Sequence, residues 1–161
     1  MTTTGRAPAR QHSRDVVDRR VFGALTGLTA LAVLLQGVWA GLFLEHDGQR
    51  DAAGGWIEVH ASDGEVAIVL AALATVWAAV RLRARRDLLF GSLALVVALI
   101  MEAYVGGLIV DDGKDSLTPL HIPLALLIMG LAVWLPVRAV SEPHGAGQVQ
   151  ADPHEHPTHR S

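Results

Sequence analysis

Cysteine is absent from the chain, and lysine occurs once, at Lys114. Without cysteine there is no disulfide, no thiolate nucleophile and no Cys-ligated iron–sulfur or zinc site. Charged residues make up only 18% of the sequence, whereas hydrophobic residues make up 51%. These absences leave a strongly apolar chain whose basic charge comes almost entirely from arginine.

The apolar residues are not spread along the chain at the period of a helix or a strand but are gathered into four long blocks: 21–44, 66–80, 88–110 and 120–137. Crossing a hydrocarbon layer of about 30 Å takes about 20 helical residues. In lipid every backbone polar group needs a partner within the protein, so blocks of this length must be helices. We therefore expect an all-α polytopic membrane protein, a four-transmembrane-helix bundle with these spans: 21–44, 58–82, 88–110 and 119–137.

The polar ends of the chain, residues 1–18 and 139–161, are expected to be disordered tails around a membrane domain of residues 19–138. The C-terminal tail carries histidines that can bind metal ions weakly: His144, His154, His156 and His159. "RRVFGALTGL" resembles a twin-arginine export signal, and "VWA" resembles a cleavage site. The apolar run is longer than the 7–15 residues of a signal peptide, which favours an uncleaved first helix.

Arginines precede the first span and crowd the connection between the second and third spans, whereas the first and third connections are acidic. The positive-inside rule then predicts that both termini are cytoplasmic. We expect a multi-pass protein of a bacterial-type plasma membrane. Its surroundings are the lipid bilayer, and no nucleic-acid partner is expected.

Two histidines, His60 and His121, stand at the start of spans that both run from outside to inside. His60 lies 21 residues before Arg81, and His121 lies 17 residues before Arg138. At the rise of a helix, the heights of the two histidines in the membrane then differ by ~6 Å, which helix tilt can absorb. Neutral imidazole can ligate iron at membrane depth without burying a net charge. Two imidazoles that face each other suit the two axial positions of a haem.

Local patterns also allow a purely structural interpretation of these histidines. "SDGE" at 62–65 is a capping-box pattern, which would start the second helix at Ser62 and leave His60 in a loop. "TP" at 118–119 has the pattern of an N-cap followed by the first helical residue, which would place His121 in the first turn.

Glu102 is an acidic residue within an apolar stretch, about 13 Å inward of Asp111 by helical rise. An intramembrane acid indicates function by default. The alternative is a protonated acid that is hydrogen-bonded to a neighbouring helix. Tyr104, near the outer end of the same span, is expected to be an interfacial anchor.

Small residues follow one face of several expected spans, where they favour close helix packing or leave room for a flat ligand. The largest sets are Gly23, Gly27, Ala30, Gly37 and Gly41 in the first span and Gly64, Ala67, Ala71, Ala74 and Ala78 in the second.

Two segments resemble the haem A synthase family. "MEAYVGGLIVDDGKDSLTPLHIPLALL" is similar to the family's stretch in which a polar residue is followed by a Gly-Gly turn, an outer loop and a ligand histidine. "WIEVHASDGEVAIVLAAL" is similar to the stretch in which an acidic residue precedes another ligand histidine. The resemblance covers residues 21–137 in topology and corresponds to one of the family's two four-helix halves. It implies that His60 and His121 are paired haem ligands on the outer side, and it places Glu102 where the family usually has glutamine.

The sequence departs from that family in two places. Ala61 replaces the arginine that usually follows the first ligand, and Glu58 precedes His60 by two residues rather than three. The resemblance therefore implies binding of haem b, for electron transfer or haem handling, with catalysis left open and Glu58 and Glu102 as candidate catalytic residues. A homodimer through the Gly-rich first helix would rebuild the two-half arrangement. The sequence does not indicate the redox partner.

Three other interpretations stay open. The chain could be a cofactor-free structural or assembly protein, or it could bind zinc or copper through His46, His60 and His121. It could also conduct ions or protons past Glu102, although that function needs further polar residues along the path.

Overall fold

The computed structural model describes residues 7–45 and 50–141, and within these ranges it contains helices and short connections but no strand. The helices are α1 (Ala7–Leu44), α2 (Arg50–Arg81), α3 (Arg86–Val110) and α4 (Thr118–Val140), with a short 3-10 turn, η1 (Asp115–Leu117), before α4. All four α-helices are long and apolar enough to cross a membrane. This confirms the prediction of an all-α chain with four helices of membrane-spanning length.

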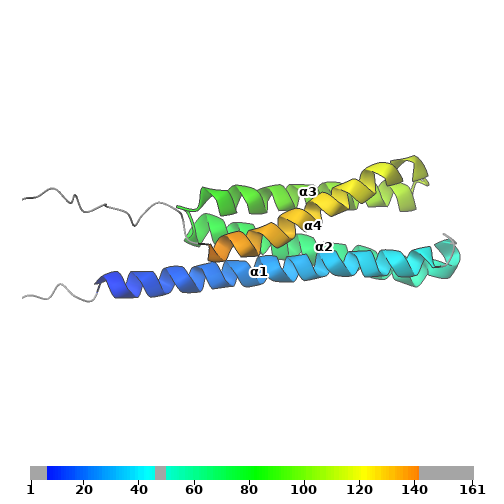
Figure 1. Cartoon of the computed structure of the whole chain (residues 1–161). Coiled ribbons are helices and arrows are strands. Elements are labelled where there is room, and N and C mark those ends of the chain that lie inside the picture. Colours follow the sequence, from blue (N-terminus) through cyan, green and yellow to red (C-terminus); the bar gives the residue numbers. More distant parts are fainter. Residues whose placement is uncertain (1–6, 46–49, 142–161) are drawn as a thin grey trace, which may run out of the picture.

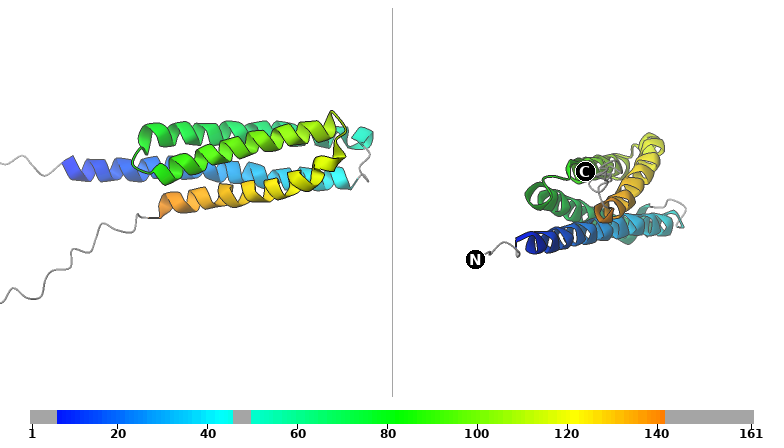
Figure 2. Two further views of the ribbon diagram at one scale, coloured as in Figure 1. Left: turned by 90° about the horizontal axis from the view of Figure 1, so that it is seen from above. Right: turned by 60° about the vertical axis from the view of Figure 1, so that its left-hand side comes forward.

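The helices lie side by side along one axis (Figure 1), and α1 projects past the other three at one end (Figures 1 and 2). Neighbouring pairs around the bundle are α1–α2, α2–α3, α3–α4 and α4–α1, so α2 and α4 are diagonal partners. The start of α1, the end of α4 and the α2–α3 connection lie together, at the left of Figure 1. We call this the inner end, because the arginines are concentrated there, and the opposite end the outer end.

The buried core occupies the inner part of the bundle. The small residues of α2 account for much of it, because Ala67, Ala71, Ala74 and Ala78 are all completely buried. Their small side chains let the neighbouring helices approach closely, as expected for helices packed in lipid. The larger side chains that fill the space around them are Phe22, Leu88, Leu95, Ile128 and Leu135.

The outward surface of the bundle is apolar. Large aliphatic side chains stand exposed on every helix, and Leu126 and Leu127 of α4 are 70% and 66% exposed. Apolar surface on this scale is unusual on a monomeric protein in water. Two prolines inside α4, Pro123 and Pro136, each remove one helical hydrogen bond, which membrane helices tolerate.

Two polar clusters fasten the inner end. Asp87 of α3 accepts hydrogen bonds from Arg85 Nε at 3.0 Å and from Arg138 Nε of α4 at 2.8 Å. Arg85 also donates from Nη2 to the Arg138 carbonyl oxygen at 2.9 Å. In the second cluster, Asp18 of α1 accepts from Arg81 Nε at 3.2 Å through its carboxylate, and from Trp77 Nε1 at 3.1 Å through its backbone carbonyl. These contacts tie α1 to α2 and the α2–α3 connection to α4.

Two helices begin earlier than the hydropathy pattern predicted. Residues 7–18, expected in a disordered tail, form the first turns of α1. α2 begins at Arg50, so the capping-box pattern at 62–65 lies inside the helix and the structural interpretation that placed His60 in a loop is wrong. Hydropathy marks where a helix meets lipid, whereas the helix itself continues into polar turns beyond it. At the other end of the chain, α4 continues to Val140, so residues 139–140, also expected in a disordered tail, are helical. The remaining parts of the expected tails, 1–6 and 142–161, lie outside the described residues.

The start of α4 is close to the prediction. The N-cap is Leu117 rather than Thr118, because η1 leads directly into the helix. His121 lies in the first turn of α4, as the sequence indicated.

Candidate functional site

His60 lies inside α2 and contacts α1. Its Nδ1 is 3.2 Å from the backbone carbonyl oxygen of Gln36. Gln36 in turn donates from its side-chain Nε2 to the His60 carbonyl oxygen at 2.8 Å. A carbonyl can only accept, so the proton of a neutral His60 ring belongs on Nδ1, and Nε2 carries the free lone pair.

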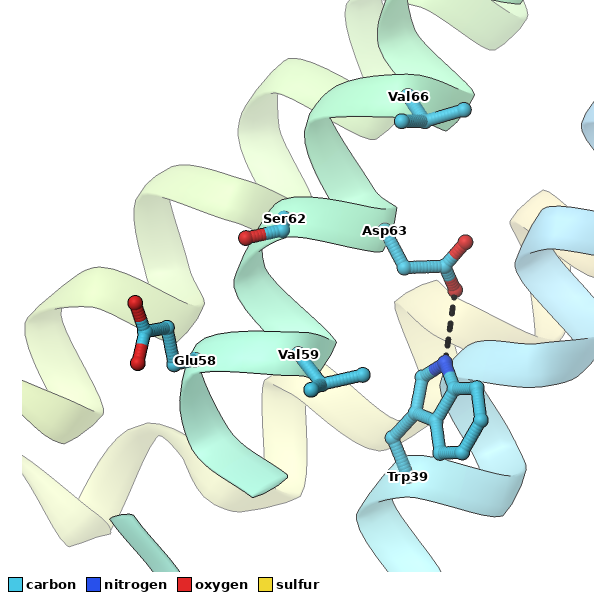
Figure 3. A pocket seen from close by; sticks show the side chains of 6 residues that line it. All are labelled: Trp39, Glu58, Val59, Ser62, Asp63 and Val66. Carbon is cyan, nitrogen blue, oxygen red and sulfur yellow. Dashed lines mark hydrogen bonds between the residues drawn. The ribbon is translucent and has the colours of Figure 1, made fainter. Parts of the chain in front are cut away.

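Asp63 extends this contact by one turn of α2. Its Oδ2 accepts from Gln36 Nε2 at 3.0 Å and from Trp39 Nε1 at 3.2 Å, the second of which is drawn in Figure 3. Trp39 stacks on Trp56, with ring centroids 5.9 Å apart and planes inclined by 10°. Asp63 therefore holds the Gln36 amide in the position in which it reaches His60.

Gln36, Trp39 and Asp63 are not among the site residues predicted from the sequence. Gln36 was detectable, because an amide within the apolar run 21–44 is expected to hydrogen-bond to another helix. Its partner was not, because the pairing depends on how α1 is rotated against α2, and the sequence does not give that rotation.

His121 of α4 lies against Glu102 of α3. Nδ1 of His121 is 3.1 Å from Oε1 of Glu102, and the two side chains are 23% and 14% exposed. The contact lacks the alignment of a hydrogen bond, so within the described ranges both carboxylate oxygens and this nitrogen are buried without a hydrogen-bond partner. A buried carboxylate without a partner is costly. The 3.1 Å distance is within hydrogen-bonding range, so it is the alignment that is missing.

Gly106, one turn beyond Glu102, makes room for the His121 ring. A Cβ atom at this position would lie 3.3 Å from Cε1 of His121. Carbon atoms in ordinary contact are ~3.5–4.0 Å apart. Only glycine therefore lets the imidazole lie this close to the backbone of α3.

The two histidines belong to diagonal helices and lie in the outer part of the bundle. His121, Glu102 and Asp63 are all close enough to His60 for electrostatic interaction. Among the described residues, every buried side chain except Val105 lies further toward the inner end than this group. The polar groups therefore gather where the bundle is packed least completely.

The other candidate residues are exposed or lie outside the described residues. Glu58 is exposed on α2, and Tyr104 is 63% exposed near the outer end of α3, as suits an interfacial anchor. His46 and the C-terminal histidines lie outside the described ranges. Within those ranges, no group of three or more His, Asp or Glu side chains is arranged to hold a metal ion.

Comparison with protein-family models, curated proteins and solved structures finds no match to this chain. Its class therefore follows from the fold alone: a four-helix protein whose helices are long and apolar enough for a multi-pass membrane protein. Within that class, its distinguishing feature is the pair of histidines, each in contact with a polar group of the next helix.

Proposed function

We propose that this chain is an integral membrane protein that binds haem b through His60 and His121, for electron transfer or haem handling. The observation that carries the proposal is the environment of the two Nδ1 atoms. That of His60 faces the Gln36 carbonyl, and that of His121 faces the Glu102 carboxylate. A histidine that ligates a metal usually has its second nitrogen hydrogen-bonded to a carbonyl or a carboxylate. Nδ1 of His60 has such a partner, and Nδ1 of His121 has a carboxylate within reach.

The residues present fit such a group. Nε2 of each imidazole is left for a metal, and the ligand type suits an iron with two axial nitrogens. The alanine face of α2 is filled by helix packing and offers no room, so a cofactor held by both histidines would have to lie toward the outer end. Haem bound there would supply one-electron redox chemistry.

The protein's own residues would set the properties of the ligands. Gln36 fixes the tautomer and the orientation of His60, because its carbonyl accepts from Nδ1. The Glu102 carboxylate beside Nδ1 of His121 makes that imidazole a more basic ligand. Neither Glu58 nor Glu102 has a position that assigns it a catalytic step, so catalysis is not part of the proposal.

Membrane insertion and orientation belong to the same proposal. The exposed aliphatic side chains of all four helices would face lipid. The arginines at the inner end, with Arg81, Arg83, Arg85 and Arg86 around one short connection, support a cytoplasmic location of that end in a bacterial-type plasma membrane.

We also propose a homodimer through α1. A Cβ atom added at Gly23, Gly27, Gly37 or Gly41 would meet nothing within 4 Å. This smooth face is therefore not used for packing within the chain, and small residues on a membrane helix favour contact with another helix.

The test of the haem proposal is an absorption spectrum of the purified protein, expressed with a supply of haem, before and after reduction with dithionite. We expect sharp α and Soret bands of a low-spin haem in the reduced protein. His60→Ala and His121→Ala should each abolish them, and His12→Ala, an exposed histidine at the inner end of α1, should not. Bands that persist unchanged in both variants would refute the assignment.

A second candidate function, a cofactor-free structural or assembly protein, is favoured by the complete burial of the alanine face of α2. In that case the small residues serve packing alone. A colourless sample with the helical content of a folded protein would support this function over haem binding.

A further inference from the structure

A groove lies at the outer end, beside α2 and Trp39 of α1 (Figure 3). It is shallow and open to the surroundings, with a volume of about 400 Å³. The groove faces away from the centre of the bundle, because Val59 and Val66 on its wall are 39% and 52% exposed. The lining residues are Trp39, Glu58, Val59, Ser62, Asp63 and Val66.

The lining combines apolar surface with hydrogen-bond acceptors. Val59, Val66 and the indole of Trp39 provide the apolar part, and Glu58 and Asp63 provide carboxylates. Among the described residues, Asp63 accepts side-chain bonds through Oδ2, from Gln36 and from Trp39, which leaves its second carboxylate oxygen for another donor. Ionised carboxylates accept hydrogen bonds but cannot donate them.

The groove is adjacent to the candidate haem ligand. Val59 precedes His60 in α2, and Asp63 bonds to the same Gln36 side chain that donates to the His60 carbonyl oxygen. A molecule in the groove is therefore separated from His60 by one hydrogen-bonded residue.

We propose that this groove binds the head group of a membrane-soluble quinol. A quinol has two hydroxyl donors for the carboxylates, a flat ring that can pack against Trp39 and a tail that reaches it through the lipid. An anionic phospholipid head group suits the groove less well, because Glu58 and Asp63 repel its phosphate. A role of the quinol as electron donor rests on the proposed haem, but binding of the quinol does not.

The test is retention of a radiolabelled decyl benzoquinol by nanodiscs that contain the full-length protein, measured anaerobically against empty nanodiscs. We expect saturable binding. Val66→Phe fills the groove and should weaken the affinity at least tenfold, and Asp63→Asn should weaken it severalfold. Val69→Phe is the matched control, because Val69 is 56% exposed on α2 but does not line the groove, and its affinity should stay within twofold.

Equal retention by the native protein and all three variants would overturn the proposal, as would retention no greater than that of empty nanodiscs. Retention in which Asp63→Asn binds normally and a phospholipid displaces the quinol would also overturn it, because the groove would then be a lipid site. Far-UV circular dichroism and the thermal midpoint of each variant confirm that it is folded. Since the assay does not use haem, loss of quinol binding and absence of haem bands are separate results.

Discussion

Replacing Gly106 with alanine tests whether the His121 ring lies against the backbone of α3. The added Cβ would lie 3.3 Å from Cε1 of His121, so the ring must move by ~0.2–0.7 Å to reach ordinary contact. Overpacking of a well-packed core costs about 1–3 kcal/mol, and the partly exposed His121 ring places this site at the low end of that range. The same substitution also replaces a helix-interior glycine with alanine, and this replacement stabilises a helix by about 0.5–1 kcal/mol.

Gly107→Ala is the matched control for this experiment. Its added Cβ would meet only Asp111 Oδ2, at an ordinary contact distance of 3.8 Å. The gain in helix stability is shared by both variants, so Gly106→Ala should be less stable than Gly107→Ala by about 1 kcal/mol. Thermal unfolding in detergent, followed by circular dichroism, measures the difference whether or not haem is present. In haem-loaded protein, Gly106→Ala should also lose more haem than the control. Equal stability of the two variants would refute the placement of His121.

Two further predictions concern the ends and the outside of the bundle. Asp87→Asn weakens the bonds to Arg85 and Arg138. Because this cluster is partly exposed, the variant should lower the free energy of unfolding, measured by chemical denaturation, by about 1–2 kcal/mol. The control Asp112→Asn breaks an exposed ion pair and should change that free energy by less than about 0.5 kcal/mol. Gly27→Leu should reduce crosslinking of the protein into dimers in membranes, whereas Gly130→Leu, at an equally open position on α4, should not. Crosslinking that yields only monomer in the native protein would disprove the homodimer.

The four membrane-length helices could be predicted because lipid leaves a long apolar segment almost no other structure. The alanine face of α2 could be predicted for a similar reason, since only small side chains allow close packing there. The starts of α1 and α2 could not be predicted from the sequence. Residues 7–18 and 50–57 are helical but too polar to give a hydropathy signal.

The candidate site was predicted only in part. The sequence indicated His60, His121 and Glu102 separately, from polar residues within or beside apolar runs. The contact between His121 and Glu102 depends on the rotation of α3 against α4, and that between His60 and Gln36 on the rotation of α1 against α2. These rotations result from the packing of many side chains, so spacing along one helix does not determine them.

The uneven distribution of packing has a consequence for local stability. The inner part of the bundle combines the buried core with the clusters around Asp18 and Asp87, whereas Val105 is the one buried side chain among the described residues beyond the histidines. Segments with few buried contacts open with a smaller free energy than the whole fold. The outer turns of α2 and α4 can therefore separate and close again while the inner turns stay associated. A molecule that enters between the helices from the outer side therefore works against this local opening energy rather than against the free energy of unfolding the whole bundle.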